Sequence, residues 1–239
     1  MKFFTFIMQL RSMKRFYILL FSVITYSIGQ SQTLKFVSFS GGAEFSSLSF
    51  ITDQKIIIKI SQEGKVLEWG YEMEPGRFYS QPGRLQPYMG RVEHYEKQFD
   101  TILNGKVKSI GISSITYYGS FENAALVGKV KSIGNVWFDY FTDFENESVR
   151  GKLKTAGQKS FTYYTSFDNE AYRGKIKSIG GNQVSYYSTF DDRSIRGKLK
   201  SIGSFNYTWY TSLDRQGYQG GLKSGSQYQL IEGVTYIIW

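Results

Sequence analysis

The chain has 239 residues, of which 41% are hydrophobic and 18% aromatic, and its formal net charge is +9. This composition supplies enough apolar surface for a buried core and excludes a disordered chain. The chain has no cysteine, which excludes disulfides, thiolate zinc sites and a lipid-modified N-terminal cysteine. Stability must therefore come from packing and backbone pairing.

Residues 1–29 are predicted to be an export signal, with cleavage near Gly29. Four basic residues precede or border its apolar run, 16–28: Lys2, Arg11, Lys14 and Arg15. The run is shorter than the roughly 20 residues that span a bilayer, which argues against the alternative of a permanent anchor. The mature chain is expected to be periplasmic, on the cell surface or extracellular, with no stable membrane span. Met13 is an alternative start. Removing 1–29 lowers the formal charge from +9 to +5, since this segment holds four basic residues and no acidic one.

Residues 30–82 are expected to form N-terminal capping strands followed by an irregular segment. Within them, KIIIKISQEGKVLEW at 55–69 predicts a β-hairpin with its turn at 61–64. Apolar, β-branched runs on both sides of a glycine-containing turn are typical of this motif.

A repeat of 23 residues follows. Six glycines recur at this interval: Gly105, Gly128, Gly151, Gly174, Gly197 and Gly220. Each of the first five is followed by a Lys-aliphatic-Lys triplet. A fixed period of this length indicates an array of supersecondary units. The array is predicted over 83–219, beginning with a degenerate 22-residue unit at 83–104, and 220–239 is expected to be a C-terminal capping hairpin.

Each unit is expected to contain two β-strands. Apolar and charged side chains alternate around Gly151, and the run 161–167 is rich in aromatic residues and threonine. Alternation places Phe161, Tyr163 and Phe167 on one face, which is expected to be concave and buried. Glycine, asparagine and aspartate in the connections favour turns.

An antiparallel meander and a parallel stack of coils both fit such units. The stack would place equivalent lysines about 4.8 Å apart, where each like pair costs about 0.9 kcal/mol even in water, against about 0.4 kcal/mol at twice that distance. The lysines therefore favour the meander. Open sheets of more than about 10 strands usually curl. The predicted fold is all-β, an antiparallel meander of 23-residue hairpins in a long curved or superhelical sheet.

The run YYTSFDNEAYRGKIKSIG at 163–180 resembles the YD, or RHS-type, repeat. The resemblance covers 83–219 and implies a winding sheet of hairpins, although Gly-Lys stands where that family prefers Gly-Arg and Phe-Asp where it has Tyr-Asp. The chain is too short for the toxin shells that such repeats build. With its export signal and GKVLEWG at 64–70, it is also similar to small exported repeat proteins of Gram-negative bacteria. MORN repeats share the period but not the aromatic-Gly-Lys order.

The face opposite the buried rings is the candidate binding surface. It combines a row of lysines with a row of aromatic rings: Lys106, Lys129, Lys152, Lys175, Lys198, Tyr118, Phe141, Tyr164, Tyr187 and Tyr210. Ammonium groups bind uronates or sulfates while rings stack on sugars, and repetition adds avidity. The expected partner is an anionic polysaccharide, another cell-envelope component or a protein. Export argues against nucleic acid. The alternative is that lysine stems cover the rings and keep the sheet soluble.

No catalytic site, metal site or cofactor is predicted. His94 is the only histidine, and a lone histidine is more often a surface residue than a base. Acidic residues recur after the second strand of each unit: Glu122, Glu145, Asp168, Asp191 and Asp214. Turn formation explains them, and the alternatives are pairing to Arg150, Arg173 and Arg196 or calcium binding. The expected function is that of an exported, non-enzymatic structural or binding module. An outer-membrane β-barrel is the alternative, and a small hydrolase that uses Asp191 is a further one.

Overall fold

The computed structural model describes residues 32–73, 81–97 and 100–239. The predicted export signal lies outside these residues. The described part is all-β, as predicted, and its one short helix is the 3₁₀ turn η1 (Thr101–Leu103). Its strands form an 11-stranded sheet, a 7-stranded sheet and a two-stranded ribbon.

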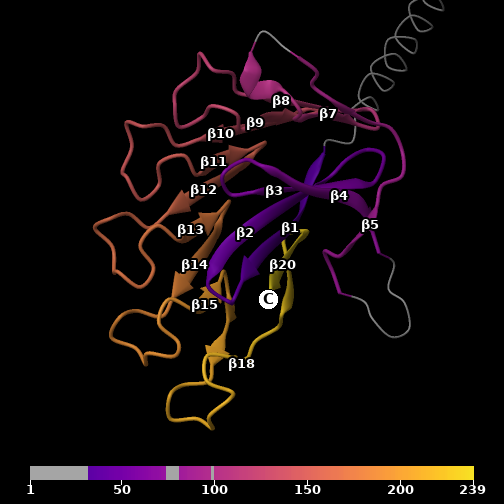
Figure 1. The fold of residues 1–239 in the computed structure, drawn as a ribbon. Helices are drawn as coiled ribbons and strands as arrows, with labels where there is room; N and C mark the ends of the chain where they lie inside the picture. The colour runs from indigo at the N-terminus through magenta and orange to yellow at the C-terminus, as the bar shows by residue number, and fades with distance from the viewer. Residues whose placement is uncertain (1–31, 74–80, 98–99) are drawn as a thin grey trace, which may run out of the picture. The chain divides into compact units, whose positions relative to one another are not determined.

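The 11-stranded sheet contains the repeats and is called the array sheet. Its strands are β6 (Val92–His94), β7 (Val107–Ile110), β8 (Ser113–Tyr117), β9 (Val130–Ile133), β10 (Val136–Tyr140), β11 (Leu153–Ala156), β12 (Lys159–Tyr163), β13 (Ile176–Ile179), β14 (Asn182–Tyr186), β15 (Leu199–Ile202) and β16 (Phe205–Asn206). They follow one another in chain order, from β6 at one edge to β16 at the other, and every pair is antiparallel. The predicted meander is therefore confirmed. Figure 1 shows the strand direction turning gradually from β7 to β15.

Each unit is numbered below from its leading glycine, so that Gly151 is position 1 and Tyr163 is position 13. The two strands of a unit meet in a two-residue turn, as where Ala156 pairs with Lys159. The first turn residue is a glycine with positive φ, for example 58° at Gly157 and 56° at Gly203. A positive φ at the first position alone is typical of type II′ hairpin turns, which glycine adopts without strain.

Neighbouring units are joined through a β-bulge. Asp139 pairs with Thr155 and Tyr140 pairs with Leu153, so Lys154 is the additional residue. The same shift recurs between β12 and β13 and between β14 and β15. Because a bulge breaks the period-two alternation, positions 4 and 5 both lie on the outer side of buried position 3. Period-two alternation alone would place position 5 on the buried face with position 3, and the bulge explains why it lies on the outer side.

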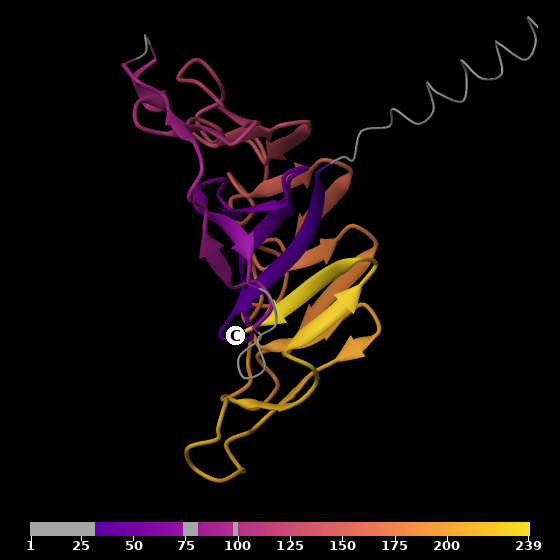
Figure 2. The same ribbon diagram turned by 90° about the vertical axis from the view of Figure 1, so that its right-hand side faces the viewer.

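The segments expected to cap the two ends of the array form one second sheet instead. Its strands are β1 (Thr33–Ser40), β2 (Glu44–Ile51), β3 (Ile56–Ser61), β4 (Val66–Glu72), β5 (Leu85–Pro87), β19 (Tyr228–Ile231) and β20 (Val234–Ile238). In space the order is β19-β20-β1-β2-β3-β4-β5, and β1 pairs in parallel with β20. Figure 2 shows β19 and β20, in yellow, beside the indigo strands and in front of the array strands. The remaining ribbon pairs β17 (Thr208–Trp209) with β18 (Leu222–Ser224).

The degenerate unit 83–104 is divided between the two sheets. Its first strand, β5, pairs with β4 of the second sheet, whereas its second strand, β6, begins the array. The predicted hairpin at 55–69 is present as β3 and β4.

The core lies between the two sheets. The Phe50 ring meets that of Phe138 edge-on at 5.1 Å between centroids, and Phe45 stacks on Phe161 at 6.2 Å. The facing aliphatic side chains of the array are also buried, including Ile110, Ile133 and Ile202 at 0% exposure. These contacts define the inner face of the array sheet as the one toward the second sheet.

Two turns of the second sheet are hydrogen-bonded to the array backbone. The Val130 N–H donates to Gly64 O at 2.9 Å, and the Leu199 N–H donates to Gly42 O at 2.8 Å. Gly64 has a φ of 78°, and a Cβ there would lie 2.3 Å from the Tyr140 Oη. Glycine is therefore required both by backbone conformation and by the close approach of the ring.

Candidate binding surfaces

The predicted lysines at position 2 are used within the fold. Each is half-buried and lies over the position-13 ring of its own unit, with 4.9 to 5.6 Å from Nζ to the ring centroid: Lys106 over Tyr117, Lys129 over Tyr140, Lys152 over Tyr163, Lys175 over Tyr186 and Lys198 over Trp209. Four of these ammonium groups, those of Lys129, Lys152, Lys175 and Lys198, also donate to backbone carbonyls. The distance is 2.9 Å from Lys129 to Glu63 O and 2.6 Å from Lys198 to Gly41 O. Both acceptors belong to turns of the second sheet, so Lys129 and Lys198 join the two sheets. The five lysines at position 2 are called the inner lysines.

Burial lowers the pKa of three inner lysines. Desolvation lowers the pKa of Lys129, Lys152 and Lys198. Lys175 instead forms an ion pair with Glu44 and donates to Gly197 O at 3.1 Å. A row in which four of five ammonium groups already donate to backbone carbonyls, and three are partly desolvated, offers little to a ligand.

The predicted aromatic residues at position 14 lie across the junctions between neighbouring units of the array sheet. The hydroxyl of Tyr118 donates to Phe138 O at 2.8 Å, and that of Tyr164 donates to Val184 O at 3.0 Å. In both cases the acceptor lies in the next unit, so the ring crosses the junction between units. All five rings are half-buried: Tyr118, Phe141, Tyr164, Tyr187 and Tyr210.

The position-14 rings are covered by a different row of lysines from the one predicted. The ammonium groups at position 4 of the following unit lie 5.0 to 5.7 Å from their centroids: Lys131 over Tyr118, Lys154 over Phe141, Lys177 over Tyr164, Lys200 over Tyr187 and Lys223 over Tyr210. With Lys108, these are called the outer lysines. The structure therefore separates the ten predicted residues into two rows. The outer lysines at position 4 were not among the predicted site residues, although alternation with the buried position 3 already places them on the outer face.

A row of hydroxyl pairs runs along the outer face beside the outer lysines. Thr162 lies between the buried residues Phe161 and Tyr163, and so points to the outer side. Its Oγ1 lies 2.6 Å from the Ser178 Oγ of the neighbouring strand. Equivalent pairs are Thr116 with Ser132, Ser185 with Ser201 and Thr208 with Ser224, at 2.6 to 2.7 Å.

The recurring acidic residues at position 18 organise the long loops between units. The Thr165 N–H donates to the Asp168 carboxylate at 2.6 Å, and Ser188 and Thr211 make the same bond to Asp191 and Asp214. Hydrogen bonds from Thr165 are the main cause that lowers the pKa of Asp168. Ion pairs link these acids to outer lysines rather than to the arginines considered above: Lys131 with Glu122, Lys154 with Glu145 and Lys223 with Asp214, at 3.0 to 3.6 Å.

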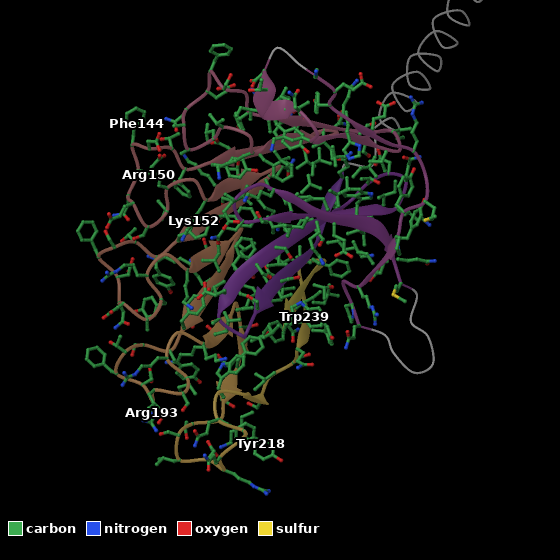
Figure 3. The ribbon with its side chains drawn as sticks, in the orientation of Figure 1. Phe144, Arg150, Lys152, Arg193, Tyr218 and Trp239 are labelled. Carbon is green, nitrogen blue, oxygen red and sulfur yellow. The ribbon has the colours of Figure 1, made fainter. Side chains whose placement is uncertain are left out.

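The tips of these loops expose one large apolar side chain each, and this corrects the prediction for Phe167. Strand β12 ends at Tyr163, and the Asp168 turn then directs Phe167 into solvent, where it is 93% exposed. The same holds at position 17 of the five units between 105 and 219, with 89 to 95% exposure: Phe121, Phe144, Phe167, Phe190 and Leu213. These residues are called the apolar row. Figure 3 shows Phe144 at the outer end of its loop, pointing away from the sheets.

The loops that carry the apolar row are hydrogen-bonded to one another. The Asn146 side chain donates to Ser166 Oγ at 2.7 Å, and Asn169 donates to Thr189 Oγ1 at 2.9 Å. At the next junction, the Ser212 N–H donates to Asp192 Oδ1 at 2.9 Å. The hydrogen bonds from Ser212 are among those that lower the pKa of Asp192 to about 2. The row is therefore held in a defined arrangement by the array.

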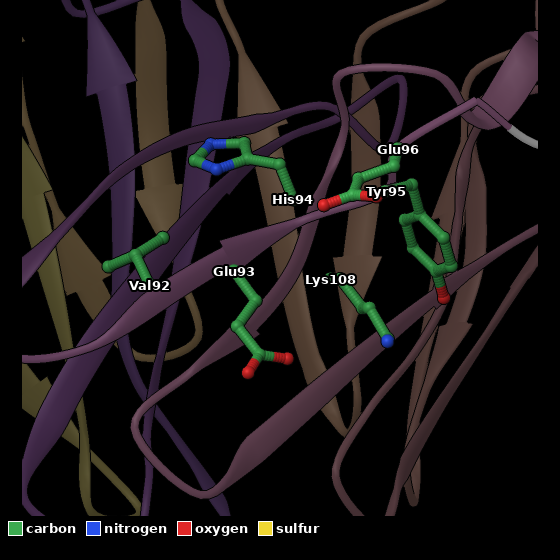
Figure 4. Close-up of a pocket in the computed structure, with 6 residues that line it drawn as sticks. All are labelled: Val92, Glu93, His94, Tyr95, Glu96 and Lys108. Carbon is green, nitrogen blue, oxygen red and sulfur yellow. The ribbon is translucent and has the colours of Figure 1, made fainter.

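A shallow hollow beside β6 contains His94. It is lined by Val92, Glu93, His94, Tyr95, Glu96 and Lys108. Figure 4 shows the His94 ring directed away from the side to which Glu93 and Lys108 point, and Glu93 is ion-paired with Arg91. The hollow therefore does not bring His94 and Glu93 together as an acid–base pair.

Comparisons of the chain with protein-family models, curated proteins and solved structures found no match. The resemblance to YD-type repeats remains a prediction from the sequence. Within residues 32–73, 81–97 and 100–239, no helix is long and apolar enough to cross a membrane. The same ranges contain no group of three or more potential metal-binding side chains.

Proposed function

We propose that this chain is an exported, non-enzymatic repeat module that binds a linear anionic polysaccharide along the outer face of the array sheet. The observation that carries the proposal is the recurrence of one donor set, an outer lysine beside a hydroxyl pair, at four of the five junctions between units. At the remaining junction, beside Lys154, Asp139 pairs with Thr155 instead. Equivalent strands are two strand spacings apart, so the set repeats about every 9.6 Å. A polymer with regularly spaced carboxylates or sulfates is a ligand of matching form.

The outer lysines keep hydrogen-bonding capacity for such a ligand. An ammonium group has three donors, and the ion pairs described above use one of them. The paired lysine side chains are also 35 to 48% exposed. Surface ion pairs of this kind contribute only about 0 to 1 kcal/mol, so an incoming carboxylate can share or replace the intramolecular one.

Repetition compensates for the weakness of each contact. Several modest sites on one rigid sheet bind a polymer more tightly than any one of them binds a monomer, because the later contacts form at high effective concentration. The proposal therefore predicts that affinity increases with the length of the saccharide.

Retention on immobilised polygalacturonate tests the proposal. The triple variant K131Q/K177Q/K200Q should elute at clearly lower salt than the unchanged protein, and neither should be retained on uncharged dextran. The control K55Q/K65Q/K97Q removes the same amount of charge from exposed lysines outside the array strands. Equal losses in both triple variants would show that only net charge matters and would contradict the proposal.

The inner lysines are unsuitable for this test. The Lys152 ammonium is half-buried over Tyr163 and donates to Gly174 O. Its replacement by glutamate would place a negatively charged carboxylate in the same desolvated position and would change stability together with binding.

A further inference from the structure

One strand of the array departs from the repeat on the outer face. Val136, Phe138 and Tyr140 of β10 are buried, so the alternate residues Trp137 and Asp139 point outward. In the other four units between 105 and 219, both positions are polar and uncharged: Ser114, Ser160, Gln183 and Asn206 in place of Trp137, and Thr116, Thr162, Ser185 and Thr208 in place of Asp139. Two departures from the repeat therefore stand at neighbouring outward positions of one strand.

The array does not need the indole of Trp137 for its own structure. The Gly157 N–H donates to Trp137 O at 2.7 Å, and the equivalent Gly180 N–H donates to Ser160 O at the same distance. A serine therefore serves this junction equally well. Trp137 is nevertheless 61% exposed, and in the described part of the chain its ring stacks on no other ring and lies under no ammonium group. Since β10 lies between β9 and β11, the indole offers an uncovered aromatic surface away from the edges of the sheet.

The carboxylate of Asp139 keeps acceptor positions for a ligand. Asp139 pairs with Thr155 of β11, without the hydroxyl pair found at the other junctions. Its Oδ1 accepts the Tyr140 N–H at 2.9 Å, and no lysine or arginine of the described residues forms an ion pair with it. A carboxylate has about four acceptor positions and no donor. The matching ligand therefore brings hydroxyl donors, and an anionic group would be repelled.

One sugar ring can contact both side chains. Alternate residues on one face of a strand are about 6.7 Å apart, which is comparable to the width of a pyranose ring with its hydroxyls. A ring whose hydroxyls are all equatorial carries its axial C–H bonds on its two faces. These C–H groups pack against the electron-rich face of an indole, while the hydroxyls at the rim point toward a neighbouring carboxylate. Glucopyranose in β-linkage has this form.

We propose that Trp137 and Asp139 form a binding site for one neutral pyranose ring of a β-linked glucan. The ring stacks on the indole, and one of its hydroxyls donates to the Asp139 carboxylate. This site goes beyond the function proposed above, because it gives the outer face one neutral-sugar position among the basic ones. It does not depend on the outer lysines binding a polysaccharide.

Nuclear magnetic resonance of the full chain with cellohexaose tests the site. The chain has four tryptophans, and the indole N–H signal that is missing from W137S belongs to Trp137. Cellohexaose should shift this signal and leave the other three unchanged. A site with one stacked ring should have a dissociation constant in the millimolar range, which is too weak to retain the protein on uncharged dextran.

The backbone amide signals of β10 allow the variants to be compared. W137S should raise the dissociation constant at least about tenfold, because stacking on one aromatic side chain contributes at least that factor. D139N should raise it about fivefold, since a hydrogen bond to a charged acceptor is stronger than one to a neutral acceptor. The control F167S removes a ring that is 93% exposed but lies at a loop tip, and it should leave the constant unaltered. Far-UV circular dichroism should be the same for all of these chains.

The repeat allows the site to be transplanted. In the next unit, Ser160 and Thr162 occupy the same two outward positions and are exposed. S160W/T162D should therefore gain an additional indole signal that shifts with cellohexaose. A transplanted indole that does not respond would contradict the assignment of binding to this pair of side chains.

Three further results would overturn the proposal. The first is a Trp137 signal that does not respond to cellohexaose up to its solubility limit. The second is an equal response to oligogalacturonate, because Asp139 should disfavour an anionic ring. The third is a Trp137 signal that shifts with protein concentration alone, which would make a second copy the occupant of this surface. Elution from polygalacturonate tests the outer lysines separately, so either proposal can fail without the other.

Discussion

Two tyrosines at the same position of consecutive units differ in one hydrogen bond, and this difference predicts their contributions to stability. Tyr140 and Tyr163 are both buried, at 0% and 4% exposure. The Tyr140 hydroxyl donates to Val130 O at 2.8 Å. The Tyr163 hydroxyl is buried without a hydrogen-bond partner among the described residues. Each tyrosine can be replaced by phenylalanine with the loss of a single oxygen.

Only one of the two replacements should lower the free energy of unfolding. Tyr140→Phe removes a buried hydrogen bond, whose net contribution is about 1 kcal/mol. Tyr163→Phe removes a hydroxyl that was desolvated without compensation, which should stabilise the protein by about 1 kcal/mol or leave it unchanged. The variants should therefore differ by about 1 to 2 kcal/mol. For a domain of this size, that corresponds to about 2 to 8 °C in Tm.

Urea unfolding followed by circular dichroism measures the difference directly. The m-values should agree, so that a change in midpoint reports stability alone. Tyr186→Phe serves as a second case of the unpartnered class, because its hydroxyl is also buried without a partner in the described part of the chain. The reasoning is refuted if Tyr140→Phe and Tyr163→Phe lower the midpoint equally.

Two further predictions concern pH and the junction between the sheets. Burial raises the pKa of Tyr140, Tyr163 and Tyr186 well above 10. Above about pH 10 these tyrosines therefore lose their protons in the unfolded chain while the folded protein keeps them. Stability should be intact below that pH and should fall above it by up to about 1.4 kcal/mol per pH unit for each tyrosine. A urea midpoint that stays constant from about pH 9 to about pH 11.5 would contradict this expectation, since the slope depends on protons held only by the folded state. Gly64→Ala should destabilise the protein by about 1 to 3 kcal/mol, because its methyl group would lie 2.3 Å from the Tyr140 Oη at a φ of 78°. Gly41→Ala, with a φ of 56° and no atom within 4 Å, should show only the smaller cost of backbone strain, and equal losses in Tm would argue against a role for the ring contact.

The array could be predicted from the sequence because its signals are local. The 23-residue interval of glycines, the alternation around Gly151 and the hairpin at 55–69 each depend on residues close together in the chain. The antiparallel arrangement followed from a simple electrostatic comparison of lysine spacings. These features needed no knowledge of distant contacts.

The candidate surface was predicted less well, for reasons that lie in particular residues. Lys154 and Thr155 are both polar, so nothing in the pattern marks the bulge that moves position 5 to the outer face. Phe167 continues an alternating run, and only the hydrogen bond from Thr165 to Asp168 shows that the strand has already ended. The acidic residue after each position-17 side chain was the available sign of that turn.

The second sheet could not be inferred from local pattern at all. Its central pairing joins Phe36 with Thr235 and Phe39 with Ile238, which lie almost a whole chain apart. Periodicity carries no information about such a contact, and both segments were therefore assigned to opposite ends of the array.

The contacts of Gly64 with Val130 and of Gly42 with Leu199 have a consequence for how this gene product can change in length. Val130 and Leu199 are separated by 69 residues, three periods of 23, and the two turns that touch them belong to a single sheet of constant width. Duplication or deletion of one module between these points would leave one turn facing the wrong neighbour. Unlike open-ended repeat proteins, which gain and lose modules freely, this protein has a second sheet whose width fixes the number of repeats between Val130 and Leu199.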